Sequence, residues 1–245
     1  MKPRLRMLPT VWAGLKESWG LYYENFLLSL ACCALWSIPH LLLLVFVYYM
    51  KDVVRPEIGQ RVTEGAYGIL IILPVIALFT GPANAGMFHT TKKLQEGNDK
   101  VTVLDFFRGA KRYFLRSWQI TASFYVIIGM FAYNLLIIEK FFPLVFIKDF
   151  FRAVTWFLLV CFILMYNYAY SFMVEQLPAY KKLWKKVALM FADNPAVSIG
   201  LGMVTLIMSW LFYSKYFCLV SMMFYIAIVS GIQYSVFKRL FARYD

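Results

Sequence analysis

The stretch Thr80-Gly81-Pro82-Ala83-Asn84-Ala85-Gly86-Met87 stands late in a long apolar segment, just before the most basic connection of the chain. Small residues, a proline and one amide occupy positions where a lipid-facing helix would carry leucines. Small residues let two membrane helices approach closely, and a polar side chain among them can bond to a neighbouring helix. The stretch therefore predicts a membrane helix whose inner half is in contact with other helices.

Two interpretations of this stretch remain open. In the first, Gly81, Ala83, Ala85 and Gly86 are packing residues. In the second, a polar pocket lies in the cytoplasmic half of the membrane, built from Thr80, Asn84 and His89. With intramembrane amides from further along the chain, the candidate polar or packing site comprises Thr80, Gly81, Pro82, Asn84, Gly86, His89, Asn134 and Asn167.

The composition places the chain in the membrane class. Of its 245 residues, 62% are hydrophobic and only 16% are charged, whereas soluble domains are about half apolar and a quarter charged. Six segments without Asp, Glu, Lys or Arg approach or exceed the roughly 20 residues that a membrane span needs: Phe26–Met50, Ala66–His89, Trp118–Ile138, Ala153–Val174, Ala196–Tyr213 and Tyr216–Phe237. We expect an all-α polytopic membrane protein with six transmembrane helices in a single domain, 1–245; the alternative is a large soluble helical core.

The distribution of basic residues predicts the orientation. Eighteen of the 25 lysines and arginines fall in the N-terminal arm, the second and fourth connections and the tail, and seven fall in the other connections. Because Lys and Arg are retained in cytoplasmic loops, we expect both termini to be cytoplasmic.

Three amphipathic helices are expected on the same cytoplasmic side. The first carries Trp12 and Trp19 on its apolar face, the second follows a Thr102–Asp105 capping box, and the third begins after Pro178. Their basic side chains would contact anionic lipid head groups, and we expect no nucleic-acid partner because the helices are tethered to the membrane. The candidate lipid contacts are Arg108, Lys111, Arg112, Arg116, Lys181, Lys182, Lys185 and Lys186.

The three amphipathic helices have the pattern of a repeat. Shifting the first by 92 and by 169 residues places Asn25 on Ser117 and on Asn194. Each unit would contain one surface helix followed by a hairpin of two spans, which predicts the units 1–90, 91–174 and 175–245. Convergent amphipathic patterning is the alternative explanation.

Three motifs carry a family resemblance: Ser37-Ile38-Pro39, Thr80-Gly81-Pro82-Ala83 with Ala85-Gly86, and Asp105-Phe106-Phe107-Arg108-Gly109. With them the chain resembles the YesL-like family of small bacterial integral membrane proteins of unknown function. Asn84 and Trp118 depart from that family's pattern. The resemblance implies a location in the bacterial plasma membrane and an accessory role linked with carbohydrate uptake systems, and it supplies no catalytic residue.

The sequence gives little support for enzyme chemistry. The two histidines, His40 and His89, lie in different segments, and the four cysteines have no paired spacing for zinc or a disulfide. No glycine-rich phosphate loop is present. We therefore expect neither catalytic residues nor a cofactor or metal.

Two functional hypotheses follow. The first is a non-catalytic accessory or scaffold protein that assists a membrane partner such as a transporter. The second is a transporter or lipid-handling protein for a neutral or amphipathic solute, with its own polar cavity. Since no charged residue lies within the spans, ion-coupled pumping is disfavoured. Whether the amides Asn84, Asn134, Asn167 and Gln233 converge on one cavity discriminates between the two hypotheses.

Overall fold

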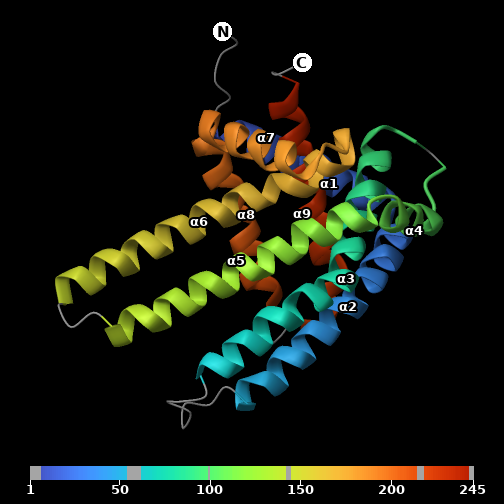
Figure 1. The fold of residues 1–245 in the computed structure, drawn as a ribbon. Helices are drawn as coiled ribbons and strands as arrows, with labels where there is room; N and C mark the ends of the chain where they lie inside the picture. The colour runs from blue at the N-terminus through green and yellow to red at the C-terminus, as the bar shows by residue number, and fades with distance from the viewer. Residues whose placement is uncertain (1–6, 54–61, 99, 142–144, 214–217, 243–245) are drawn as a thin grey trace.

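The structure, a computed structural model, describes residues 7–53, 62–98, 100–141, 145–213 and 218–242. Over these ranges the chain is all-helical, which confirms the expected all-α class. The helices are α1 (Met7–Glu24), α2 (Phe26–Val53), α3 (Val62–Gln95), α4 (Val103–Arg112), α5 (Phe114–Phe141), α6 (Val145–Gln176), α7 (Tyr180–Asp193), α8 (Pro195–Tyr213) and α9 (Cys218–Phe241) (Figure 1).

Local sequence signals explain several helix ends. Pro195 opens α8 at its first position, where a proline loses no intrahelical hydrogen bond. Gly97 follows α3 with a φ of 71°, a left-handed conformation that glycine adopts without strain. After α6, Leu177 takes a φ of 44° and Pro178 then prevents the helix from continuing. Each of these ends turns the chain toward the next helix.

Each short helix passes into a long helix through a single residue. The axis bends by 101° between α1 and α2 and again by 101° between α7 and α8. At both bends an asparagine side chain donates to the carbonyl four residues earlier: Asn25 to Leu21 over 3.0 Å and Asn194 to Met190 over 3.4 Å. The two corners are therefore built in the same way, at positions that the 169-residue shift superposes.

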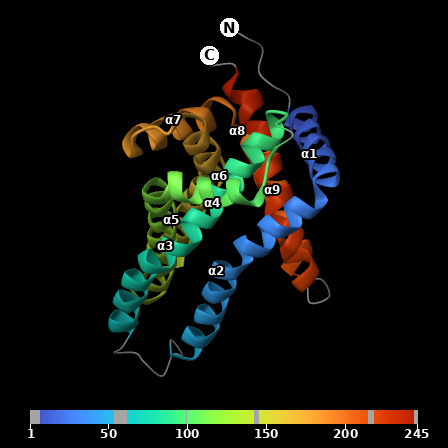
Figure 2. The ribbon, with the colours of Figure 1, turned by 90° about the vertical axis from the view of Figure 1, so that its right-hand side faces the viewer.

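Helices α1 to α9 of the described ranges pack in a cyclic order. Along the chain, one short helix and two long helices follow each other three times. The second long helix of each set (α3, α6 and α9) lies at the centre, where these three helices contact one another. The first long helix of each set packs on the central helix of the set before it: α5 on α3, α8 on α6 and, closing the circle, α2 on α9. Each short helix does the same: α4 packs on α3, α7 on α6, and α1 on α9. The first and last helices thus lie side by side (Figure 2). The order of one short and two long helices occurs three times, while the unit boundaries at 90/91 and 174/175 stay a prediction.

One helix, α6, is long and apolar enough by itself to cross a membrane. Two bent pairs also meet that criterion when each is taken as one span: Leu8–Glu24 with Phe26–Leu42, and Tyr180–Asp193 with Pro195–Met208. Within the part of the chain that was described, length and composition therefore support one to three spans. The other predicted spans fall on α3, α5 and α9, and the full set of six stays a prediction.

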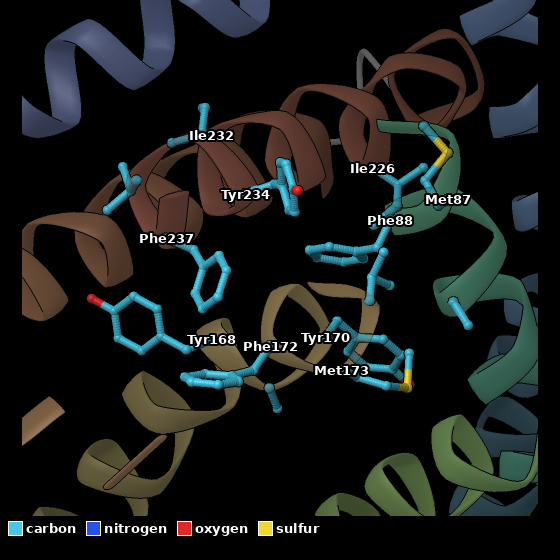
Figure 3. Packing of buried hydrophobic residues seen from close by; sticks show 14 of the residues in the cluster. Met87, Phe88, Tyr168, Tyr170, Phe172, Met173, Ile226, Ile232, Tyr234 and Phe237 are labelled. Carbon is cyan, nitrogen blue, oxygen red and sulfur yellow. The ribbon is translucent and has the colours of Figure 1, made fainter. Parts of the chain in front are cut away.

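Buried aromatic and aliphatic side chains fill the space between the central helices. Figure 3 shows Phe88, Phe172 and Phe237 pointing into this space from α3, α6 and α9. The Phe172 and Phe237 ring centroids are 5.1 Å apart in an edge-to-face arrangement, which contributes about 0.5–1.5 kcal/mol beyond area burial. This core holds together the C-terminal ends of the three central helices, near the polar groups described next.

Candidate functional site

The glycines of the Thr80–Met87 stretch lie against backbone of the second unit. A Cβ atom at Gly81 would stand 2.8 Å from the Ser117 carbonyl oxygen, and one at Gly86 would stand 2.7 Å from the Phe106 carbonyl oxygen. Because backbone atoms cannot rotate away as a side chain can, only glycine permits these approaches. Pro82, between them, is also buried. The packing interpretation of these three residues is the one that the geometry supports.

Asn84 connects three helices. Trp36 on α2 donates its Nε1–H to Asn84 Oδ1 over 2.6 Å, and Asn84 Nδ2 donates to the Tyr170 hydroxyl on α6 over 3.5 Å. Thr80, one turn earlier, accepts a hydrogen bond from the Tyr125 hydroxyl over 3.2 Å. Both polar residues of the stretch are thus used in interhelical hydrogen bonds, of the kind that averages about 0.6 kcal/mol in membrane proteins.

The four amides of the predicted spans do not converge on one site. Asn167 Oδ1 accepts from Gln233 Nε2 over 2.8 Å, which joins α6 to α9. Asn84 bonds to other partners, and Asn134 is exposed on α5. The amides therefore form separate interhelical contacts, and their positions give no support to one shared solute cavity.

His89 lies at the junction of α3 and α4. Its side chain is buried, and a Cβ atom at Gly109 would stand 2.5 Å from His89 Cβ. The imidazole centroid is 5.7 Å from the ring of Tyr113. His89 is therefore part of the α3–α4 packing and does not belong to the Asn84 contacts.

Asp105 holds the same junction by charge. Its carboxylate is buried and accepts from Lys93 Nζ over 2.6 Å, from Arg108 over 3.1 Å and from the Thr102 backbone N–H over 2.9 Å. The last of these contacts confirms the predicted capping box. Burial alone would raise the pKa of Asp105, but the hydrogen bonds from Lys93, Thr102 and Arg108 outweigh it and hold the pKa well below its ordinary value of 3.8.

The predicted lipid contacts lie on α4, the start of α5 and α7. Most of these side chains are exposed; Arg116 is half-buried and donates to Gln119 over 3.0 Å. The exposed members are Arg108, Lys111, Arg112, Lys181, Lys182, Lys185 and Lys186. Arg108 is also bound to Asp105, and Lys186 donates to Gln176 over 2.6 Å. Exposed apolar side chains accompany the cations, among them Phe107 and Leu189.

A second polar cluster, which the sequence analysis did not identify, joins the central helices. Lys92 Nζ lies 3.0 Å from Glu175 Oε2, and the Tyr234 hydroxyl donates to the same oxygen over 2.6 Å. Nearby, Gln95 on α3 donates to Ser235 on α9 over 2.6 Å. The sequence contained one sign of this cluster: three of the predicted apolar segments each end in polar residues at their C-terminal side.

Among the described residues, no three His, Cys, Asp or Glu side chains are grouped as metal ligands would be. His40 stacks on Trp36 with ring centroids 3.8 Å apart, and it lies on α2, away from the α3–α4 junction that holds His89. These contacts are structural in character, and they bring no nucleophile and base together.

Fold and site together define a helical protein with at least one helix suited to a membrane, in which the predicted cytoplasmic ends of the helices are joined by polar contacts. Comparison with known families makes this specific. The model of the family described as a protein of unknown function, DUF624, matches residues 21–135. The match covers slightly less than half of the chain, and over this segment the chain is similar to that family, the YesL-like small bacterial membrane proteins.

The match includes Ser37–Pro39, the Thr80–Met87 stretch and the Asp105–Gly109 motif, which are the residues that carried the resemblance. Helices α6 to α9 lie beyond it. No curated protein and no solved structure matches the chain.

Proposed function

We propose that the protein is a non-catalytic integral membrane accessory or scaffold protein of the bacterial plasma membrane. In this proposal it crosses the membrane several times, keeps both termini in the cytoplasm and assists a partner membrane protein. The observation that carries it is the use of the intramembrane polar groups: Asn84 bonds to Trp36 and Tyr170, and Asn167 bonds to Gln233. Polar groups used in this way stabilise a helix bundle, which supports an accessory role over a solute path lined by these amides.

The basic helices give the proposed protein a second contact, with anionic lipid head groups. Lys111 and Arg112 on α4 and Lys181 and Lys185 on α7 are exposed. Each such cation near an anionic leaflet contributes about 1 kcal/mol. The exposed Phe107 on the same helix as Lys111 and Arg112 would enter the interface, as expected of a helix lying on a membrane.

The partner that we propose is a transporter, and a carbohydrate uptake system is the expectation that comes with the family resemblance. No nucleic acid is involved in this proposal. The absence of a catalytic role is also part of it, and it is motivated by the structural contacts of both histidines and of Asp105.

The proposal is tested by reconstitution. The full chain is cross-linked in native membranes, extracted in mild detergent and purified, and the membrane protein that co-purifies in fixed stoichiometry is identified. That partner is then placed in liposomes with and without the chain, and its transport rate is measured. A change in rate or stability of the partner supports an accessory role; solute uptake by liposomes that contain the chain alone contradicts it.

A further inference from the structure

A cavity of about 250 Å³ opens where α7 crosses the C-terminal ends of α6 and α9. Its floor is apolar and comes from Phe172, Leu189, Met190 and Phe241. Lys186, Gln176 and Asp193 complete the lining. Small-molecule sites usually have about 300–1,000 Å³, so this cavity suits one large side chain better than a whole cofactor.

The cavity lies on the side of α7 opposite Trp184, toward the C-terminal end of α6. Trp184 on the opposite side of α7 stacks on Phe162 of α6, with ring centroids 5.5 Å apart. Lys186 instead reaches Phe172 and Gln176, which lie ten and fourteen residues further along α6. Because α6 rises about 1.5 Å per residue, the Lys186 side of α7 lies well beyond the Trp184 side, toward the end of α6.

The floor is suited to an aromatic anchor. The Phe172 and Phe241 ring centroids are 5.5 Å apart in an edge-to-face arrangement, and Phe241 stacks on Phe237 at 5.3 Å. A third ring added to such a pair gains edge or stacking contacts. Met190, whose side chain is unbranched, can adapt to the shape of the entering group.

The charges around the cavity favour an acidic partner. Lys182 and Lys186 are exposed one turn apart on α7, and Lys186 belongs to the lining of the cavity. Asp193 is the opposing charge in the lining, at the far end of α7 from Lys182. An acidic side chain is therefore attracted to the Lys182–Lys186 end of the cavity.

We propose that this cavity binds an acidic cytoplasmic segment of a partner protein through one aromatic side chain of that segment. The ring of the anchor occupies the space over Phe172 and Phe241, and a neighbouring carboxylate pairs with Lys186. This inference rests on the proposed accessory function and assigns the place where the partner attaches.

The test uses the purified full chain in detergent and a fluorescein-labelled synthetic peptide with one Phe between Glu residues. Two control peptides carry Ser in place of the Phe, or Lys in place of the Glu residues. Fluorescence anisotropy is measured at several salt concentrations. We expect the Phe-to-Ser peptide to bind about tenfold more weakly or worse, because an anchor residue carries much of the binding energy.

Two pairs of protein variants locate the binding. Leu189→Trp fills the cavity and should weaken binding about tenfold, whereas Ala188→Trp, at an exposed neighbouring position outside the lining, should bind like the wild type. Lys186→Gln should lower both the affinity and its salt dependence more than Lys181→Gln, which is exposed outside the cavity. Elution profile and thermal unfolding verify that each variant is folded.

Three outcomes would overturn the inference: equal binding of the Phe and Ser peptides, wild-type binding by Leu189→Trp, or loss of co-purified phospholipid from Leu189→Trp in native mass spectrometry, which would identify a lipid as the occupant. The two proposals fail separately. If the partner still co-purifies with Leu189→Trp, the accessory role stands and the cavity is not its attachment site. If the peptide binds as expected but the wild type affects no partner, the cavity stands and the accessory role fails.

Discussion

Lys92 and Glu175 form an ion pair at the centre of the molecule, with 3.0 Å between Nζ and Oε2. The pair joins α3 to α6, and the Tyr234 hydroxyl, which donates to the same carboxylate oxygen, adds α9. One carboxylate thus connects all three central helices. Both charged side chains are mostly shielded from solvent, so the pair is less screened than a surface pair would be.

We expect Glu175→Gln to lower the free energy of unfolding by about 1–3 kcal/mol, because hydrogen bonds to a charged group are lost and Lys92 keeps its charge. Thermal unfolding in detergent measures the change. Glu96→Gln is the matched control, since Glu96 also faces Lys92, at 3.7 Å, but is half exposed; its effect should be about 0–1 kcal/mol. An equal loss of stability in the two variants would contradict the prediction, because it would show that the central position of Glu175 adds nothing to the free energy of unfolding.

The stabilisation from Asp105 should depend on pH in a defined direction. Its pKa is lowered in the folded protein, so the stabilisation is complete above the unfolded-state pKa near 3.8 and is lost as the pH falls through the folded value. We expect Asp105→Asn to unfold at lower temperature than the wild type near neutral pH, and this difference to shrink below about pH 4. Asp149→Asn, in the exposed pair of Asp149 with Arg152, should show little difference at any pH. If the difference in unfolding temperature between Asp105→Asn and the wild type stayed constant down to pH 2, the lowered pKa of Asp105 would be contradicted.

Gly81→Leu should destabilise the protein by at least about 1–3 kcal/mol, the usual cost of overpacking, because its Cβ would already meet the Ser117 carbonyl at 2.8 Å. Gly20→Leu is the control: a Cβ at Gly20 meets no atom within 4 Å. Fluorescence-detected elution and unfolding temperature compare the two. Wild-type stability of Gly81→Leu would mean that α3 and α5 are not in close contact.

Asn84→Leu tests the function of the amide. Since Asn84 bonds to Trp36 and Tyr170, we expect a loss of about 0.6 kcal/mol per hydrogen bond and normal partner binding. Asn134→Leu, at an exposed position on α5, should be nearly neutral. Loss of partner binding in Asn84→Leu at unchanged expression and unfolding temperature would show instead that the amide belongs to a functional site.

The predicted topology is tested by reporter fusions. Fusions after Asp245 and within residues 51–65 should report opposite sides of the membrane, because the basic residues favour a cytoplasmic tail and an external first connection. As a control, each position is fused both to a reporter that is active only in the cytoplasm and to one that is active only outside it. Signals from the same side would rule out the six-span arrangement.

The sequence allowed the helices to be predicted but not how they meet. Long apolar runs and the Thr102–Asp105 capping box are local signals, and the helices occur where these signals place them. The amphipathic stripes were only partly informative: on α1, Tyr22 is buried against α9 while Trp12 and Trp19 are exposed. A stripe shows that a face is apolar without showing whether protein or lipid covers it.

The Lys92–Glu175 pair could not be found from the sequence for a different reason. Each residue stands at the end of an apolar segment, where a charged side chain is ordinarily solvated. Their contact depends on α3 and α6 meeting at the centre, which no local pattern specifies. The same holds for Asn84, whose partners Trp36 and Tyr170 are 48 and 86 residues away.

The contact between α1 and α9 determines when the molecule can be completed during synthesis. Gly14 of α1 lies against Val236, and Glu17 pairs with Arg239 over 3.0 Å, so α1 is matched with a helix that leaves the ribosome much later, since the paired residues are 222 positions apart. Until α9 emerges, the side chains of α1 that it will cover have no partner within the chain. A nascent chain that stalls before α9 would therefore present this uncovered surface to chaperones and proteases, although α1 to α8 had already been made.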